Sequence, residues 1–270
     1  MPPQTRILAV IPARLASTRL PRKVLRDLNG QPLLAWTVEA ALRCPQLSEV
    51  LIAADSEQVA HLCSTRGWPC LMTSPDLPSG SDRLFAVARH LPADIYVNIQ
   101  ADEPLLQPAH IEALLRPFAR PEVHVTTLRV RCPEPSVHDP NVVKVVTTPD
   151  DRALYFSRAP IPFHRDAHTH THTPAHLRTG PAPHPATTFW KHLGLYAFRA
   201  AALARFAALT PSPLEQTERL EQLRLLENGI ALYAPEVTED TIGVDTEEDL
   251  HRVSLLLPHQ PLCIIRDGQR

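Results

Sequence analysis

A cluster of cationic side chains follows the first apolar segment of the chain. Residues 7–11 (ILAVI) have the length and composition of a buried strand in a parallel sheet. Arg14, Arg19 and Lys23 come next, among small residues. Ligands collect at the carboxyl ends of strands in open α/β sheets, and arginine and lysine donate to phosphate oxygens. The segment therefore predicts a phosphate site, and a solvated surface loop is the alternative that the residues leave open.

The phosphate segment lacks both common glycine-rich motifs, G-x-x-x-x-G-K-[ST] and G-x-G-x-x-G. Its order x-P-A-R-x-x-S-T-R-L-P-x-K resembles the nucleotide loop of the 3-deoxy-manno-octulosonate (Kdo) cytidylyltransferases, also called CMP-Kdo synthetases. The resemblance implies nucleotide contacts at Ala13, Arg14, Ser17, Arg19 and Lys23, with Arg14 and Lys23 also catalytic. Arg22 departs from the family pattern, which usually has glycine there.

An acidic pair, Asp102 and Glu103, follows another apolar segment at residues 95–99. Carboxylates at the end of a strand could hold Mg²⁺ against phosphates, or they could cap a helix near Pro104. The family has a similar Gln-Gly-Asp-Glu-Pro segment. The resemblance implies that Asp102 is a catalytic metal ligand and that Gln100 lies near the nucleotide or the sugar. Ala101 replaces the family's glycine.

A second carboxylate stands near the carboxyl end of the chain, at Asp245 in the segment GVDT. It precedes Thr246, the predicted N-cap of the last helix, so from the residues alone it could serve the helix or a metal. The resemblance implies that Asp245 is the second, catalytic Mg²⁺ ligand. Two carboxylates beside an anionic substrate would repel it, so the sequence predicts strict Mg²⁺ dependence.

Four further segments match family segments that contact the acidic sugar. They are SGSDR at 79–83, YFSR at 155–158, HLGLY at 192–196 and LEQLR at 220–224. The resemblance implies sugar contacts at Arg83, Gln100, Arg158, His192, Tyr196, Glu221 and Gln222. Without the resemblance, the preferred explanations would be an exposed arginine, a hydrogen-bonded strand histidine and surface polar residues.

Strand and helix patterns alternate along the first hundred residues. Apolar spacing predicts a helix over 32–43, a strand over 50–54, and a helix capped by Asp55-Ser56. This alternation indicates an α/β fold with a mainly parallel, doubly wound sheet, and the resemblance adds a smaller mixed α/β subdomain over about 142–212. An S-x-x-E capping box with proline at the first helical position predicts one helix from Ser212 to the stop at 228–229.

Composition narrows the class of protein. A net charge of −2 and a pI near 6.7 give no basic field for nucleic acid or anionic lipid. Five scattered cysteines, without a C-x-x-C pair, favour reduced cytosolic thiols. We find neither a signal peptide nor a membrane span, and expect a soluble cytoplasmic enzyme. One nucleotidyltransferase domain is predicted over 1–257, with a His- and Pro-rich insert at 164–190 and a tail at 258–270.

The family resemblance covers about residues 7–257 and implies a reaction. CTP and Kdo would give CMP-Kdo and pyrophosphate, for lipopolysaccharide synthesis, in a cytoplasmic homodimer. Two alternatives stay open: a CMP-sugar synthetase for sialic acid or amino-Kdo, and a catalytically inactive protein that binds nucleotide or, through its histidines, metal.

Overall fold

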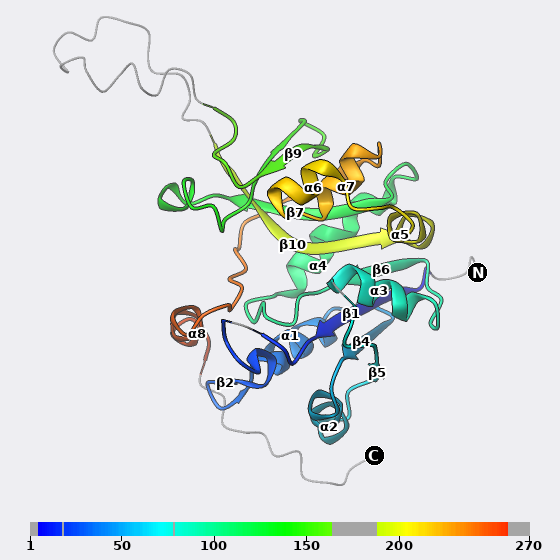
Figure 1. The fold of residues 1–270 in the computed structure, drawn as a ribbon, viewed down its shortest axis with the longest axis vertical. Helices are drawn as coiled ribbons and strands as arrows, with labels where there is room; N and C mark the ends of the chain where they lie inside the picture. Colours follow the sequence, from blue (N-terminus) through cyan, green and yellow to red (C-terminus); the bar gives the residue numbers. More distant parts are fainter. Residues whose placement is uncertain (1–4, 18, 78, 164–187, 259–270) are drawn as a thin grey trace, which may run out of the picture.

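A ten-stranded mixed sheet organises the molecule (Figure 1). The computed structural model describes residues 5–17, 19–77, 79–163 and 188–258. The path through the sheet is β11-β7-β10-β6-β1-β4-β5, with β12 on β7 and the hairpin β8–β9 on β10. The predicted α/β class is confirmed. The predicted subdomain limits stay a prediction, and most of the insert and the tail lie outside the described residues.

The first half of the sheet is parallel, as the sequence predicted. Its strands are β1 (Ile7–Ala13), β4 (Glu49–Ala54), β5 (Cys70–Met72) and β6 (Ile95–Asn98). Strand β1 lies between β4 and β6 and is parallel to both, so their carboxyl ends meet at one edge. The residues that follow these strands therefore come together in space.

The second half of the sheet is mixed. Strand β10 (Trp190–Arg199) is antiparallel to β6, to β7 (Val125–Arg131) and to β8 (Lys144–Thr147). The outer strands are β9 (Ala153–Ser157), β11 (Leu232–Tyr233) and β12 (Glu236–Val237). A separate small hairpin joins β2 (Asp27–Leu28) to β3 (Gln31–Pro32). Strand β10 thus brings the second half of the chain against the parallel strands.

Helices cover both faces of the sheet. They are α1 (Leu33–Leu42), α2 (Glu57–Arg66), α3 (Gly80–Ala88), α4 (Pro108–Leu115), α5 (Ala200–Ala207), α6 (Pro213–Glu218), α7 (Gln222–Glu227) and α8 (Glu247–Ser254). Single turns of 3-10 helix lie at η1 (Lys23–Leu25), η2 (Arg116–Ala119) and η3 (Glu134–Ser136). Side chains of α1, α2 and α4 belong to one buried cluster, and those of α3, α5 and α7 to another.

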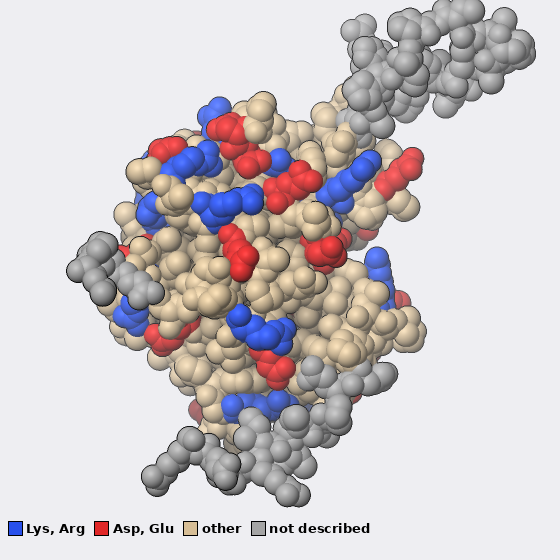
Figure 2. Space-filling model, turned by 180° about the vertical axis from the view of Figure 1, so that it is seen from behind, with Lys and Arg blue, Asp and Glu red and all other residues tan. Residues whose placement is uncertain are grey.

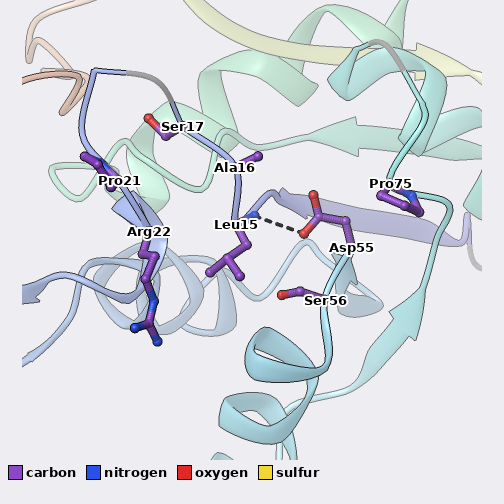
Figure 3. A pocket seen from close by; sticks show the side chains of 8 residues that line it. All are labelled: Leu15, Ala16, Ser17, Pro21, Arg22, Asp55, Ser56 and Pro75. Atoms are coloured by element: carbon purple, nitrogen blue, oxygen red, sulfur yellow. Dashed lines mark hydrogen bonds between the residues drawn. The ribbon is translucent and has the colours of Figure 1, made fainter.

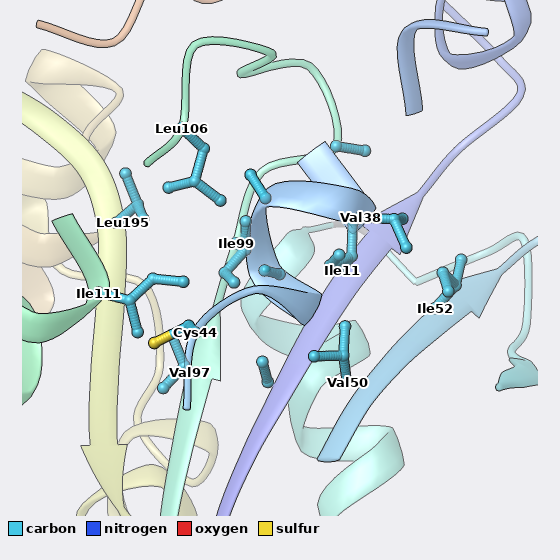
Figure 4. Close-up of a cluster of buried hydrophobic side chains, with 14 of the residues drawn as sticks. Ile11, Val38, Cys44, Val50, Ile52, Val97, Ile99, Leu106, Ile111 and Leu195 are labelled. Atoms are coloured by element: carbon cyan, nitrogen blue, oxygen red, sulfur yellow. The ribbon is translucent and has the colours of Figure 1, made fainter. Parts of the chain in front are cut away.

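Side chains that alternate between the two faces of β1 explain why helices cover both faces of the sheet. Leu8 and Val10 pack in one cluster, while Ala9, Ile11 and Ala13 pack in the other, and all five are fully buried. Figure 4 shows the cluster around Ile11. Fully burying one aliphatic side chain of this size stabilises a fold by about 1.5–3 kcal/mol. An apolar residue at every position of a strand therefore requires helices on both faces.

The caps predicted at Ser56 and Thr246 are present in the structure. The Ser56 side chain accepts from the Val59 amide at the start of α2, and Gly67 ends that helix at a φ of 66°. Thr246 and Asp249 form a reciprocal capping box at the start of α8. Helix α3 also begins with a capping box, formed by Ser79 and Asp82.

The single helix predicted from Ser212 to residue 228 is wrong, because the segment forms two helices. Helix α6 ends at Arg219, which takes a left-handed φ of 57°, and α7 starts at Gln222. The Arg158 guanidinium donates to the carbonyls of Glu218 and Arg219, and so draws backbone acceptors out of the helical path. A distant side chain thus overrides a local helix pattern.

Charge is spread over the surface rather than gathered. On the face shown in Figure 2, Lys and Arg side chains are interspersed with Asp and Glu side chains. In the described part of the chain, no helix has the length and apolar character needed to cross a membrane.

Candidate active site

A cavity of about 440 Å³ lies at the carboxyl ends of β1 and β6. Its walls come from the segment after β1, from the start of α3, from the segment after β6 and from two distant carboxylates: Pro12, Arg14, Ala16, Ser17, Arg19, Lys23, Val24, Ser79, Gly80, Gln100, Ala101, Asp102, Glu221 and Asp245. The predicted phosphate segment and the predicted metal carboxylates therefore face one space, although they lie far apart in the sequence. This is the edge of an open α/β sheet where ligands are expected.

Lys23 bridges the two predicted metal ligands at the wall of this cavity. Its Nζ donates to Asp102 Oδ2 and, at 2.8 Å, to Asp245 Oδ1. Arg19 Nη2 reaches the other oxygen of Asp245, also at 2.8 Å. The arrangement places two carboxylates around one positive charge, which shows that a cation is accommodated between them.

The charges at this bridge stabilise one another. Burial disfavours the ammonium of Lys23, but attraction to Asp102 and Asp245 outweighs it and raises the pKa of Lys23. Burial also works against the carboxylate of Asp245, yet the hydrogen bond and charge of Lys23 lower the pKa of Asp245. The two groups are therefore charged at neutral pH.

A backbone hydrogen bond fixes the distance between the two aspartates. The Val244 amide donates to the Asp102 carbonyl at 2.9 Å, directly beside Asp245. Upstream, Lys191 on β10 pairs with Asp240 at 2.8 Å and holds the same segment against the sheet. The two carboxylates are thus preorganised by backbone and side chains outside the cavity.

The aspartate pair has the donor chemistry that Mg²⁺ requires. This ion prefers oxygen ligands and usually takes one or two carboxylates together with phosphate oxygens and waters. Within the described ranges, no group of three or more His, Cys, Asp or Glu side chains is gathered to hold a metal. Asp102 and Asp245 would therefore supply two ligands, and a bound phosphate chain and waters would supply the others.

Arg14 has a free donor at the cavity. Its Nη2 is buried and has no hydrogen-bond partner among the described residues. A buried donor without a partner costs free energy unless a ligand satisfies it, so an anion in the cavity would complete this site. Ser17 and Arg19 also line the cavity. The Ala13 side chain is fully buried in the core and does not line it.

An aromatic cluster lies beside the cavity on β10. The His192 and Tyr196 rings are 5.5 Å apart, and Phe156 packs edge-on against His192 at 4.9 Å. The pKa of Tyr196 is raised by burial and then by the negative charge of Glu221, which lines the cavity. Three predicted sugar residues, His192, Tyr196 and Glu221, therefore come together.

The hydrogen-bonding state of His192 is set by its surroundings. Burial, followed by the nearby charge of Lys191, lowers the pKa of His192 to about 3, so the ring is neutral at physiological pH. Thr127 Oγ1 lies 2.9 Å from its Nε2. Neutral His192 and protonated Tyr196 are polar groups suited to hydroxyls rather than to charges.

Glu103 is a buried carboxyl beneath Asp102. Burial, then repulsion by Asp102, raises the pKa of Glu103 to about 8. A neutral Glu103 keeps a third negative charge from forming beside Asp102 and Asp245. Gln100 joins this region to β10, because its Nε2 donates to the Gly194 carbonyl at 3.4 Å while the side chain lines the cavity.

The structure gives Arg158 partners within the protein, and its predicted sugar contact stays a prediction. The Nε–Nη2 edge, which could pair with a carboxylate, donates instead to the carbonyls of Glu218 and Arg219. Nη1 donates to the Pro140 carbonyl at 2.9 Å, and the residue does not line the cavity. Arg158 joins β9 to the end of α6 and is structural here.

The predicted sugar contact of Arg83 also stays a prediction. Its side chain is 0% exposed, does not line the cavity, and donates to Thr73 Oγ1. Its Nη2 lies 3.9 Å from Asp55 Oδ2. Arg83 thus lies beside Asp55, while its Nε and Nη2 are buried without a hydrogen-bond partner among the described residues. Gln222 is 4% exposed and does not line the cavity, so its predicted sugar contact stays a prediction.

Sequence reasoning missed the role of Asp55. The sequence predicted that Asp55 is part of a helix cap. In the structure its Oδ1 accepts from the Leu15 amide at 2.9 Å, and so it holds the phosphate segment. The signal was present in the sequence, because an aspartate directly after a buried strand lies at the same edge as the site. Ser79 and Gly80, which start α3, also line the cavity.

The two departures from the family pattern differ in their consequences. Ala101 is buried and is not among the residues with a positive φ, so it carries none of the strain that a methyl group adds there. Arg22 does take a left-handed φ, of 57°, at the position where glycine was expected. That backbone strain requires compensation elsewhere.

Comparisons with known proteins identify the family of this chain. The sequence model of a family described as "Cytidylyltransferase" matches residues 8–238. The chain is 55% identical over 251 residues to the 3-deoxy-manno-octulosonate cytidylyltransferase of Acidobacterium capsulatum, covering 93% of this chain and 96% of that one. It is 45% identical to the protein of the same name from Koribacter versatilis, covering 93% and 89%.

Solved structures show the same likeness. A CMP:2-keto-3-deoxy-manno-octonic acid synthetase complexed with CTP superimposes with a TM-score of 0.84 at 37% identity, covering 93% of this chain and 98% of that one. The 4-diphosphocytidyl-2C-methyl-D-erythritol synthase of Anaerococcus prevotii, at a TM-score of 0.61 and 11% identity over 94% and 98% of the two chains, shares the fold.

Proposed function

This chain belongs to the cytidylyltransferase family, and from that premise we propose the reaction that its site performs. It transfers CMP from CTP to the anomeric hydroxyl of 3-deoxy-D-manno-octulosonate and releases pyrophosphate. The product, CMP-Kdo, is an activated sugar for lipopolysaccharide assembly. The observation that carries the proposal is the bridge of Lys23 between Asp102 and Asp245, beside the unpartnered Arg14 donor.

The reaction requires positioning and charge neutralisation rather than a covalent enzyme intermediate. The sugar hydroxyl attacks the α-phosphorus in line, the bond from that phosphorus to the bridging oxygen breaks, and pyrophosphate leaves. Arg14 and Arg19 hold the triphosphate by donating to its oxygens, and Lys23 neutralises charge that accumulates on the leaving group. These three side chains come from one short loop, residues 14–23, so one bound nucleotide can contact all of them.

We propose Mg²⁺ as the cofactor, held by Asp102 and Asp245. The metal would neutralise phosphate oxygens and lower the pKa of the attacking hydroxyl. The support is the donor chemistry of the two carboxylates and the accommodation of a cation between them.

The sugar would lie on the β10 side of the cavity. Tyr196 and neutral His192 offer hydrogen bonds to sugar hydroxyls, and Glu221 at the cavity wall accepts them. Gln100 lies between this cluster and the phosphate loop, where it can contact both substrates. The sugar hydroxyl then faces the phosphate chain across the aspartate pair.

Pyrophosphate release with CTP and a panel of acidic sugars tests the proposal. We expect release that depends on Kdo, with kcat/KM at least about tenfold higher than with sialic acid, because unpaired polar groups in a hydrogen-bonding site reject an analogue. Amino-Kdo completes the panel. Release with another acidic sugar but not with Kdo would keep the chemistry and change the specificity. CTP binding without release from any sugar would favour an inactive nucleotide-binding protein.

Replacing Arg158 with alanine separates a structural role from sugar recognition. The substitution removes three hydrogen bonds to carbonyls, so we expect the free energy of unfolding to fall by about 1–3 kcal/mol and Tm to fall by several degrees. The affinity for Kdo, measured as KM, should stay within about threefold of the wild type, because no contact with the sugar is lost. If the KM for Kdo instead rose by about 50-fold or more while Tm stayed the same, the result would support a contact between Arg158 and the sugar carboxylate.

We also propose a homodimer in the cytoplasm. Exposed apolar side chains at Leu154, on β9, and at Leu214, on α6, give the second half of the sheet a surface that a second copy could cover. The four cysteines that the structure describes are free thiols, as expected in a reducing compartment. Light scattering at micromolar concentration checks the dimer, and a monomeric mass would contradict it.

A further inference from the structure

We propose that Arg22 is a positioning residue of this enzyme. Its side chain ties the nucleotide loop, residues 14–23, to helix α2 and thereby holds Lys23 between the two aspartates. The inference rests on the proposed function, because the tie matters through the nucleotide that the loop binds. Arg22 itself contacts neither the substrate nor the reacting atoms.

The first observation is the backbone of Arg22. It takes φ 57° and ψ 33° at the start of η1, a left-handed conformation that glycine adopts freely and an arginine does not. The Leu25 amide donates to the Arg22 carbonyl at 2.9 Å, so the strained residue forms the first turn of η1. A strained residue in a binding loop persists only where its surroundings hold it.

The second observation is the partner of the side chain. Arg22 Nη2 donates to Gln58 Oε1, in the first turn of α2, at 2.6 Å. A hydrogen bond from a charged donor is stronger than one between neutral groups. The side chain that compensates the strained backbone therefore also connects the loop to a helix on the core.

A second cavity shows why the loop needs such a tie. This cavity of about 440 Å³ separates the loop from the corner between β4 and α2. Figure 3 shows Ala16 and Pro21 on the loop side and Ser56 on the corner side. Open space behind the loop leaves room for it to move away from the nucleotide.

Two hydrogen bonds join the loop to this corner, one near each end of the loop, and the bond from Arg22 to Gln58 is exposed. The Leu15 amide donates to Asp55 Oδ1 at 2.9 Å, and Arg22 donates to Gln58 (Figure 3 shows the first). Both acceptors belong to the same corner. Arg22 directly precedes Lys23, so the second tie fixes the backbone from which the bridging ammonium extends.

Single and double substitutions at the tie test its effect on CTP binding, measured by calorimetry with Mg²⁺. We expect Gln58→Ala and Arg22→Ala each to raise the Kd and KM for CTP about three- to tenfold and to lower kcat as well, because a displaced Lys23 neutralises less charge on the leaving group. The double variant should be no worse than the single ones, because both remove one interaction. Gln58→Glu should keep wild-type binding, because a carboxylate accepts from Arg22 as well as an amide does.

Arg22→Gly separates the tie from the backbone strain. It removes the side chain and relieves the left-handed φ, so we expect a Tm about 2 °C or more above that of Arg22→Ala, with equally weak CTP binding. Glu49→Ala is the matched control. It removes an exposed bond of similar length, 3.0 Å from Arg6 Nη2, at the opposite end of β4, and should leave CTP binding unchanged.

Three results would overturn the proposal. The first is wild-type CTP affinity in Gln58→Ala. The second is a double variant whose Kd for CTP rises by the product of the two single increases. The third is wild-type CTP affinity in Arg22→Gly. If the wild-type protein binds CTP but turns over no sugar, only the proposed function is contradicted, because the calorimetric comparison needs no turnover. If the wild-type protein shows the proposed turnover and Gln58→Ala binds CTP as tightly as the wild type, only the positioning role of Arg22 is contradicted.

Discussion

Replacing Asp102 with asparagine is expected to lower kcat for CMP transfer by about 10²- to 10³-fold, because the proposed metal, which would stabilise the developing charge, loses one carboxylate ligand. The shape of the side chain is kept, but one charge of the pair around Lys23 is lost. Asp245→Asn should have a similar effect. The double variant should lose little more than the worse single variant, because the two carboxylates hold one cation and act as a unit.

The controls separate charge at the site from charge in general. Asp150→Asn removes an exposed carboxylate in the turn between β8 and β9, and should keep wild-type kcat. Thermal unfolding checks that Asp102→Asn is folded. Its Tm should change by only a few degrees, because Lys23 keeps Asp245 as a partner. Activity within about fivefold of the wild type in Asp102→Asn would contradict the assigned role.

Removing divalent metal with EDTA is expected to abolish pyrophosphate release, and added Mg²⁺ should restore it. Without the metal, Asp102 and Asp245 present two negative charges to a triphosphate, and Lys23 and Arg19 are paired with these carboxylates rather than free for the phosphates. Ca²⁺ should restore far less activity, because its longer and more flexible coordination does not reproduce the geometry of Mg²⁺. Appreciable turnover in EDTA would contradict the metal assignment.

A binding experiment checks the same assignment without turnover. Calorimetry with CTP should give an affinity at least about tenfold higher with Mg²⁺ than with EDTA for the wild type, because the metal removes the repulsion between the carboxylates and the triphosphate. In the variant carrying both Asp102→Asn and Asp245→Asn, the repulsion is gone together with the ligands. The affinity should then depend little on the metal. A dependence as large as that of the wild type would place the metal elsewhere.

Residues within one short segment were predictable because their chemistry is local. The segment from residue 7 to Lys23 predicted a strand that ends in a cationic loop, and the structure has β1 followed by Arg14, Arg19 and Lys23 at one cavity. Apolar residues at every position of β1 require burial on both faces, so the doubly wound sheet followed from the sequence.

Contacts between distant segments were not predictable from local patterns. The helix predicted to start at Ser212 is broken by Arg158, which lies far away in the sequence and takes the carbonyls at the end of α6. For the same reason Arg158 and Arg83 do not line the cavity. An arginine pairs with the acceptors that the fold brings to it, and its own segment does not reveal whether these are carbonyls, a carboxylate or a ligand.

The sequence by itself determined which chemical groups are present and which strand ends carry them. The tertiary structure alone decided their partners. The Val244 amide meets the Asp102 carbonyl, so Asp245 arrives beside Asp102 and Lys23 joins both. Arg22 reaches Gln58 on α2, a contact that no local pattern encodes. Parallel strands bring distant residues to one edge, but the hydrogen bonds and charges formed there depend on packing of the whole chain.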